Sequence, residues 1–167
     1  MDCFIRICDK PCITKPIHFS SYTSADSKVA TLQLCYGTRC IIIQLLHLDY
    51  IPNSLRNLLS DQSITFVGVG ITQDIAKLDR DYGLKCWAGN ELGALSDSSF
   101  GRATHLSGGA EFASMMHKLF ELPVEKPVNV TRSDWSINIL NTEQIKYATV
   151  DAYVYFEYGE YLCQLLR

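Results

Sequence analysis

Alternating apolar and polar positions give the clearest pattern in the first half of the chain. Two apolar runs, 29–35 and 39–45, flank Tyr36-Gly37-Thr38, a pattern typical of a β-hairpin with Gly37 in the turn. Residues 64–70 form an apolar run that predicts a short strand buried on both faces. Residues 84–88 predict one more short strand. The first half of the chain therefore predicts a sheet that begins with a hairpin.

Helical periodicity accounts for most of the remaining chain. Apolar positions three and four residues apart predict four helices, over residues 52–60, 73–82, 111–120 and 141–166. Gly83 is the residue type that commonly ends a helix, and Asn141 with Gln144 resembles a capping pair at the start of the last one. Residues 89–109, rich in Gly, Ser, Ala and Asp, predict a loop with a short helix. Strands followed by strands that alternate with helices predict an α/β domain with a mixed sheet covered by helices.

Length and charge narrow the class of protein. The 167 residues suit one domain with its own core. The net charge of −3 provides no positive field to attract nucleic acid, so a phosphodiester substrate has to be held locally by a few Lys or Arg residues or by metal ions. No apolar run approaches the roughly 20 residues of a membrane span, and the N-terminus lacks a signal-peptide pattern. We therefore expect an intracellular protein, in the nucleus or the cytoplasm.

The seven cysteines, an odd number, are scattered along the chain. In an intracellular protein they are expected to be reduced thiols. An alternative is a zinc site, although the spacing of its candidate ligands matches no common Cys-x-x-Cys pair. These candidate ligands are Cys3, Cys8, Cys12 and His18. Partly buried, unreactive thiols are the favoured interpretation.

Three polar residues stand where a reaction could take place. Asp74 follows the carboxyl end of the 64–70 strand, the end at which α/β sheets bind ligands. Tyr147 and Asp151 are four residues apart in the last helix and so share one face. Two acids and a tyrosine suit a metal-dependent phosphodiester hydrolase, since carboxylates bind divalent cations and a phenol can orient water. Each residue also has a purely structural interpretation. An acid in the first turn of a helix is stabilised by the helix dipole, and a Tyr–Asp pair four residues apart occurs on ordinary helices.

An ordered set of segments carries a family resemblance. The segments are 29–35, 39–45, 66–71 with Asp74, 125–127, 131–135 and 147–152. With them the chain resembles, from Lys28 to Leu166, the plant branch of the Werner-syndrome-type 3′–5′ exonucleases of the DEDDy superfamily. The resemblance implies an α/β, ribonuclease-H-like fold with a mixed five-stranded sheet flanked by helices. We expect a single domain over residues 1–167, in which 1–27 is a divergent or truncated first-strand region.

By position, the resemblance implies a role for each of the three residues. Asp74 and Asp151 resemble metal ligands, and Tyr147 resembles the tyrosine that positions the nucleophilic water. The family removes nucleotides from the 3′ ends of DNA or RNA with two Mg²⁺ or Mn²⁺ ions. The resemblance therefore implies a 3′–5′ exonuclease that acts on nucleic acid by two-metal-ion hydrolysis.

The first motif of the family, an Asp-x-Glu pair whose carboxylates bind metal, is not found in this chain. If residues 4–8 are the remnant of the first strand, Asp9 takes the position of the aspartate and acts as a third ligand, but Pro11 falls in place of the glutamate. Fewer carboxylates hold fewer cations, so one ion or none is expected in place of two. The chain is then a weakened or inactive copy, or its gene model has an incorrect 5′ end.

Several other residues have two interpretations each. Lys126 and Arg132 are candidate phosphate contacts or solvated charges. Trp135 is a candidate for stacking on a base, while anchoring of the linker onto the core is the favoured interpretation. Aromatic residues of the last helix pack in the core or offer a surface to a partner subunit, so a homo-oligomer is one expectation. The competing hypothesis for the whole chain is a non-catalytic module that keeps the fold for nucleic-acid binding or protein assembly.

Overall fold

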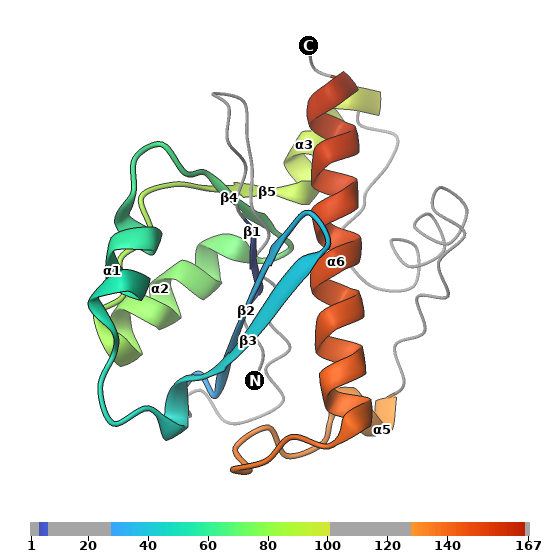
Figure 1. Ribbon diagram of the computed structural model, residues 1–167. Coiled ribbons are helices and arrows are strands. Elements are labelled where there is room, and N and C mark those ends of the chain that lie inside the picture. Colours follow the sequence, from blue (N-terminus) through green and yellow to red (C-terminus); the bar gives the residue numbers. More distant parts are fainter. Residues whose placement is uncertain (1–3, 7–27, 101–127, 166–167) are drawn as a thin grey trace.

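The computed structural model describes residues 4–6, 28–100 and 128–165 (Figure 1). Its elements in chain order are β1 (Phe4–Arg6), β2 (Thr31–Tyr36), β3 (Arg39–Gln44), the 3₁₀ helix η1 (Leu45–His47), α1 (Asn53–Ser60), β4 (Phe66–Gly68), α2 (Ile71–Tyr82), β5 (Gly89–Glu91), α3 (Leu92–Phe100), α5 (Val128–Thr131) and α6 (Thr142–Leu165). The helix predicted over 111–120 lies outside the described residues.

The predicted hairpin is confirmed as β2 and β3. The two strands pair antiparallel in an unbroken register from the Thr31–Gln44 pair to the Tyr36–Arg39 pair. Gly37 lies in the turn at φ +55°, a left-handed conformation that glycine adopts without strain. Alternate side chains of the hairpin therefore face opposite layers of the molecule.

The strands form two hydrogen-bonded sheets, in the order β1-β2-β3 and β4-β5. β1 runs parallel to β2, β3 is antiparallel to β2, and β4 and β5 are parallel to each other. The strand directions are mixed, as predicted. In the described part of the chain, hydrogen bonds do not join the strands into the single five-stranded sheet that we expected, because β1 lies beside β4 without pairing to it.

β4 leads directly into α2 through a left-handed glycine. Gly70, at φ +72°, is the N-cap, and its carbonyl accepts the amides of Gln73 and Asp74 at 3.1 and 3.2 Å. Gly83, at φ +61°, follows the last residue of the helix as predicted, and its amide donates to the Asp79 carbonyl at 2.8 Å. Residues with a Cβ adopt these conformations only at a cost, so the two glycines set the ends of α2.

The prediction of a strand over residues 84–88 is wrong. The strand in this part of the chain is β5, which begins at Gly89. Residues 84–88 instead form the return from α2, where the Trp87 amide donates to the Leu59 carbonyl at 3.0 Å. At Gly89, the first residue of β5, a Cβ would lie 2.6 Å from the Ile75 side chain of α2. Glycine is therefore what allows this strand to approach the helix so closely.

Helices cover both faces of the strands (Figure 1). α1 and α2 pack on one face, where Leu32 and Leu34 of β2 share an apolar core with Leu59 of α1. α6 packs on the other face, against Cys35 of β2 and against Val67 of β4. The predicted α/β architecture, strands flanked by helices, is confirmed, and α6 spans both sheets.

The start of α6 is fixed by the predicted capping pair. The Asn141 amide donates to Gln144 Oε1 at 3.0 Å, and the Gln144 amide donates to Asn141 Oδ1 at 2.9 Å. Gln144 Nε2 also donates to the Asp134 carbonyl at 2.9 Å, which ties the preceding loop to the helix. Among the described helices, α6 included, none combines the length and the apolar composition needed to cross a membrane.

The expectation that all cysteines are reduced is wrong at one pair, because Cys35 and Cys40 form a disulfide. They lie opposite each other in the hairpin register, with Cα atoms 4.1 Å apart, so the hairpin itself brings the two sulfur atoms together. Cys86 is a free thiol, and the Cys163 side chain is buried. The alternative zinc ligands lie outside the described residues, namely Cys3, Cys8, Cys12 and His18.

Candidate functional site

Asp74 lies in the first turn of α2, shortly after the carboxyl end of β4, as predicted. Its side chain is completely buried. Neither carboxylate oxygen has a hydrogen-bond partner within the described part of the chain. A buried carboxylate without a partner is costly, because it has lost its hydration and has gained no hydrogen bond in exchange. This position therefore favours a bound cation or a proton.

The surroundings of Asp74 favour its protonated form. Burial raises the pKa of this carboxyl well above its ordinary value, with the Lys77 ammonium acting in the opposite direction and the Glu91 carboxylate adding to the increase. The same region raises the pKa of the Cys86 thiol to about 12, through burial first and then through the charges of Asp74 and Asp79. Without a cation, Asp74 is therefore a neutral acid over a wider pH range than an exposed aspartate.

Glu91 holds the start of α2 from the end of β5. Its Oε2 accepts the Gly70 amide at 2.9 Å, and its Oε1 accepts the Thr72 amide at 3.3 Å. Amides at the start of a helix have no partner within the helix. A carboxylate at this end also interacts favourably with the helix dipole. Glu91 thus fixes the turn that carries Asp74.

Tyr147 and Asp151 come from one face of α6, as their spacing predicts. Both side chains are buried, and the Tyr147 hydroxyl lies 3.5 Å from Asp151 Oδ2, at the long limit of a hydrogen bond. The Tyr147 ring packs against Trp135, with 6.2 Å between the ring centroids. This packing fixes the Tyr147 hydroxyl beside the Asp151 carboxylate.

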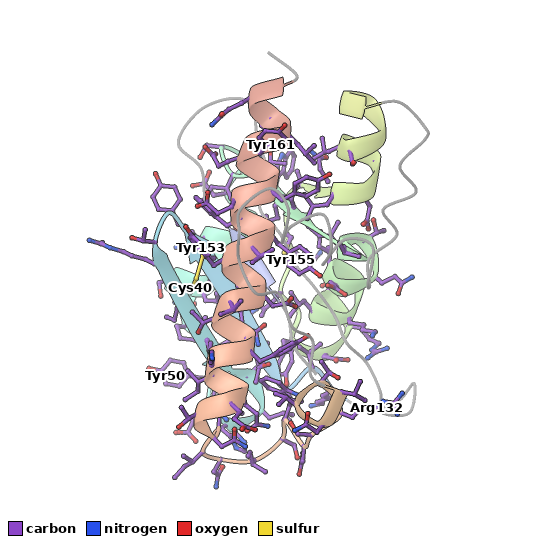
Figure 2. The ribbon with its side chains drawn as sticks, turned by 90° about the vertical axis from the view of Figure 1, so that its right-hand side faces the viewer. Cys40, Tyr50, Arg132, Tyr153, Tyr155 and Tyr161 are labelled. Carbon is purple, nitrogen blue, oxygen red and sulfur yellow. A yellow bond between two sulfur atoms is a disulfide. The ribbon has the colours of Figure 1, made fainter. Side chains whose placement is uncertain are left out.

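Tyr155, one turn beyond Asp151 on α6, links the two acidic positions. Its ring is fully buried in the core between α6 and β4, and it projects from the opposite side of α6 to Tyr153 (Figure 2). The pKa of Tyr155 is raised well above its ordinary value, first by burial and then by Asp151, Tyr147 and Asp74. The carboxylates of α2 and α6 thus both act electrostatically on the same buried phenol.

The side chains of Asp74 and Asp151 have the oxygen ligands that hard divalent cations prefer. Carboxylate oxygens are the ligands that Mg²⁺ and Mn²⁺ prefer, and both oxygens of Asp74 are unused. Within residues 4–6, 28–100 and 128–165, no group of three or more His, Cys, Asp or Glu side chains is arranged to hold a metal ion. Two carboxylates therefore suit a single ion completed by water or substrate, and a second ion needs further ligands.

The other predicted site residues occupy different environments. Asp9 and Lys126 lie outside the described residues. Arg132 follows α5, and its exposed side chain lies beside that helix (Figure 2). Trp135 has only 3% of its surface exposed and belongs to the core under α6. The structure thus confirms that Trp135 anchors the loop, and a ring so deeply buried offers no face on which a base can stack.

Two residues of this region are absent from the sequence-based set of site residues. Tyr155 does have a signal, since it lies four residues from Asp151 on the same helix face, but the many tyrosines of that helix obscure it. Glu91 has no local signal, because the amide of Gly70 that it binds lies 21 residues away in sequence. Only the pairing of β5 with β4 brings the two together.

Comparison with known proteins identifies the family. The family model described as 3′–5′ exonuclease matches residues 17–167. A 3′–5′ exonuclease of Arabidopsis thaliana is 32% identical over 127 residues, which are 75% of this chain and 42% of the relative. The chain therefore spans less than half the length of that relative.

Two solved structures agree with the fold. RNase D of Escherichia coli, an exoribonuclease involved in structured RNA processing, has a TM-score of 0.66 and 23% identity over 81% of this chain and 34% of its own. NrnC of Brucella melitensis, solved with bound Mg²⁺, has a TM-score of 0.60 and 19% identity over 83% of this chain and 65% of its own. At these identities the likeness shows the fold, which is the expected ribonuclease-H-like α/β fold. Since the family model matches most of its length, the chain belongs to the 3′–5′ exonuclease domain family.

Proposed function

We propose that this domain removes nucleotides from the 3′ ends of nucleic acid by metal-dependent hydrolysis. The observation that carries this proposal is the buried, unpartnered carboxylate of Asp74 in the vicinity of the Tyr147–Asp151 pair. Acids from two helices and one phenol are groups that such a reaction uses. Membership of the 3′–5′ exonuclease domain family supports the direction of cleavage.

Each residue has a separate task in the proposed reaction. Asp74 and Asp151 hold the cation; when bound, Mg²⁺ or Mn²⁺ supplies positive charge that stabilises the charge developing on the phosphate. Tyr147 orients the attacking water, since a phenol hydroxyl both donates and accepts a hydrogen bond. Arg132 and Lys126 are the proposed phosphate contacts.

We further propose that the reaction is slow. Two buried carboxylates, those of Asp74 and Asp151, are the proposed ligands among the described residues, and Asp9 is the proposed source of a third. Two carboxylates offset the mutual repulsion of two divalent ions poorly, so one ion is held and a second is not. The substrate class is DNA or RNA with a free 3′ end, and the plant Werner-type branch remains our prediction for the finer relationship.

The test follows 5′-labelled DNA and RNA oligonucleotides, single-stranded or with recessed 3′ ends, in Mg²⁺, Mn²⁺ or EDTA. We expect products shortened stepwise from the 3′ end with the metal ions and none with EDTA. Asp74→Asn and Asp151→Asn are expected to lower the rate about 100-fold or more, because each removes a charged ligand. Tyr147→Phe removes only the hydroxyl, and a loss of about 100-fold is expected for it too.

Asp79→Asn is the matched control, since Asp79 lies exposed on α2 and the substitution changes the net charge equally. Its rate is expected to equal that of the wild type. Equal rates for the wild type and Asp151→Asn would reveal a contaminating nuclease and contradict the proposal.

A second candidate function is a non-catalytic module for nucleic-acid binding or protein assembly. It is favoured by the small number of candidate metal ligands in the described part of the chain. In this case Asp74 stays protonated in the folded domain. Binding of the labelled oligonucleotides without any shortening, at equal affinity for wild type and Asp151→Asn, would support this candidate over the exonuclease.

A further inference from the structure

Within the described part of the chain, β3 is the last strand of its sheet. Its outer edge therefore carries backbone amides and carbonyls that β2 does not use. Proteins commonly protect such edges with several charges, a proline or a bulge. β3 has one charge, Arg39 at its first position, and its register with β2 is unbroken. The edge of β3 is therefore suited to pairing with another strand.

The amides of Cys40, Ile42 and Gln44 point away from β2. Cys35 and Cys40 have Cα atoms 4.1 Å apart, the close spacing of an antiparallel pair that exchanges no hydrogen bonds. Because the two kinds of pair alternate along a ladder, every second residue of β3 directs its amide and carbonyl outward. Three positions on one edge thus offer donors and acceptors to another strand.

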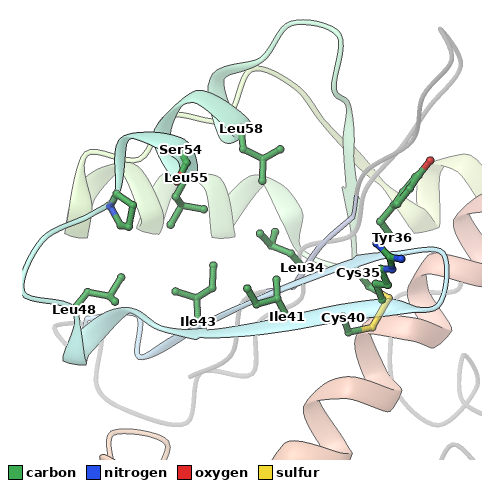
Figure 3. Close-up of a pocket in the computed structure, with 12 residues that line it drawn as sticks. Leu34, Cys35, Tyr36, Cys40, Ile41, Ile43, Leu48, Ser54, Leu55 and Leu58 are labelled. Atoms are coloured by element: carbon green, nitrogen blue, oxygen red, sulfur yellow. A yellow bond between two sulfur atoms is a disulfide. The ribbon is translucent and has the colours of Figure 1, made fainter.

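Apolar side chains line both faces of this edge. On the α1 side, Ile41 and Ile43 point from β3 into an apolar groove of about 500 Å³ that Leu55 and Leu58 of α1 also line (Figure 3). On the α6 side, a second groove of about 500 Å³ includes Ile139. Of the nine exposed large hydrophobic side chains of the described residues, five line one of the two grooves and two more, Leu46 and Tyr50, lie just after β3 in the chain. The five are Tyr36, Ile41, Leu48, Ile139 and Ile145. Clusters of this kind mark interaction surfaces.

We propose that β3 pairs antiparallel with β3 of a second copy of this chain, about a two-fold axis through Ile42. In this register Cys40 lies opposite Gln44 of the partner subunit, and Ile42 lies opposite its own counterpart. The three outward-facing residues of each strand then all pair, which gives about six main-chain hydrogen bonds. The sheets of the two copies become one continuous sheet.

The sequence of β3 complements itself in this register. Ile41, which is 55% exposed, lies opposite Ile43 of the partner subunit, so the two apolar side chains cover each other. The two Arg39 side chains lie about 20 Å apart, at opposite ends of the interface and beyond the Debye length at physiological salt. A parallel pairing in register would instead place the two arginines side by side. The antiparallel interface is the same patch on both copies, and it closes as a dimer.

Residues beside the strand extend the contact beyond the backbone. A stable interface buries about 800 Å² on each partner, more than one strand edge alone provides. Leu46, Leu48 and Tyr50 follow β3 directly, and Tyr50 is 77% exposed. Figure 2 shows Tyr50 on the same side of α6 as Cys40 of β3. These side chains supply apolar area next to the paired strands.

The proposal is tested by sedimentation velocity on the full chain. The average mass is measured at protein concentrations from about 1 to 200 µM, without metal or nucleic acid, because a dimer in equilibrium with monomer dissociates on dilution. We expect a monomer–dimer equilibrium that Ile41→Arg weakens at least tenfold, because it places charge in an apolar contact. Trp87→Arg is the matched control, since Trp87 is 59% exposed and lines neither groove. Circular dichroism checks that both variants are folded.

Amide exchange followed by NMR identifies the surface that pairs. We expect the amides of Ile42 and Gln44 to exchange more slowly as the concentration rises, while those of Ile41 and Ile43, already paired with β2, change little. A monomer at every concentration overturns the proposal, as does a dimer that Trp87→Arg weakens equally or one that leaves Ile42 and Gln44 unprotected. Because neither metal nor substrate is present, none of these results bears on the proposed nuclease activity.

Discussion

The charge state of Asp74 is coupled to folding, because its carboxyl is completely buried and unpartnered within the described residues. Its pKa in the folded state is raised, chiefly by burial. At a pH between the ordinary and the raised pKa, the folded state therefore binds a proton that the unfolded state has released. Stability is then lost as the pH rises through this interval, and below the ordinary pKa the penalty is absent.

We predict that Asp74→Asn stabilises the metal-free protein, and more so at high pH. The asparagine amide resembles the protonated carboxyl but cannot ionise, so the variant does not bear the cost of a buried charge at high pH. The unfolding free energies of the two proteins should be similar near pH 4. At pH 8 the variant should be more stable by at least about 1.4 kcal/mol, the equivalent of one pKa unit. Urea denaturation in EDTA at both pH values measures the difference.

Asp79→Asn serves as the control for this experiment, since its side chain is exposed and its stability difference should stay constant with pH. A constant difference for Asp74→Asn as well would mean that the folded protein does not resist ionisation of this carboxyl. The burial argument for a cation site would then fail.

At the scale of single residues, the sequence was sufficient to select candidates and insufficient to describe their surroundings. Asp74, Tyr147 and Asp151 were selected because strand ends and helix spacing are local rules. The missing hydrogen bonds of Asp74 and the central place of Tyr155 depend on how α2 and α6 pack across the strands. The spacing of residues along the sequence does not predict how distant segments pack.

At the scale of elements, the beginning of α2 depends on a neighbouring strand. Glu91 at the end of β5 accepts the amides of Gly70 and Thr72, whereas α6 is capped by its own Asn141 and Gln144. The cap of α6 was predictable because both partners lie within one turn. The cap of α2 was not, because it forms only after the two strands have paired.

We predict that Glu91→Ala loosens the first turn of α2. The substitution removes two hydrogen bonds to a charged acceptor, so the unfolding free energy should fall by about 1–2 kcal/mol. The free energy of the local opening that exposes the Thr72 amide to hydrogen exchange should fall by a similar amount. Urea denaturation and hydrogen exchange measure the two effects.

Glu143→Ala is the comparison, because Glu143 is an exposed acid in the first turn of α6. Its loss should cost only the few tenths of a kcal/mol expected from the helix dipole. Equal costs for the two substitutions would show that the bonds from Glu91 do not hold α2.

Segments whose structure depends on distant contacts were the ones predicted incorrectly. The hairpin and the end of α2 follow from Gly37 and Gly83, and both were predicted, whereas α2 begins at Ile71, two residues before its predicted start. A strand was predicted over 84–88, but the strand begins at Gly89. There the Ile75 side chain approaches so closely that only a residue without a Cβ fits. The Cys35–Cys40 disulfide depends on the exact register of the hairpin, which an apolar run does not define.

At the scale of the whole molecule, α6 holds the fold together by packing on both sheets. The α2 layer lies across the strands from it and packs in a separate apolar core. Asp74 comes from α2 and Asp151 from α6, so a cation bound by both carboxylates would connect the two layers directly. Such a site exists only in the folded chain, and binding must therefore increase the stability of the whole domain.

We predict that Mn²⁺ raises the melting temperature and that the increase requires both acids. At a free Mn²⁺ concentration of 100 times Kd, the unfolding free energy gains about 2.7 kcal/mol, which corresponds to about 5–10 °C for a domain of this size. Asp74→Asn and Asp151→Asn should each lose the increase, whereas Asp79→Asn should keep it. An equal increase in Asp151→Asn would place the ion elsewhere, for example on surface acids, and would remove the link between α2 and α6. Thermal melts monitored by circular dichroism, with Mn²⁺ and with EDTA, decide between these outcomes.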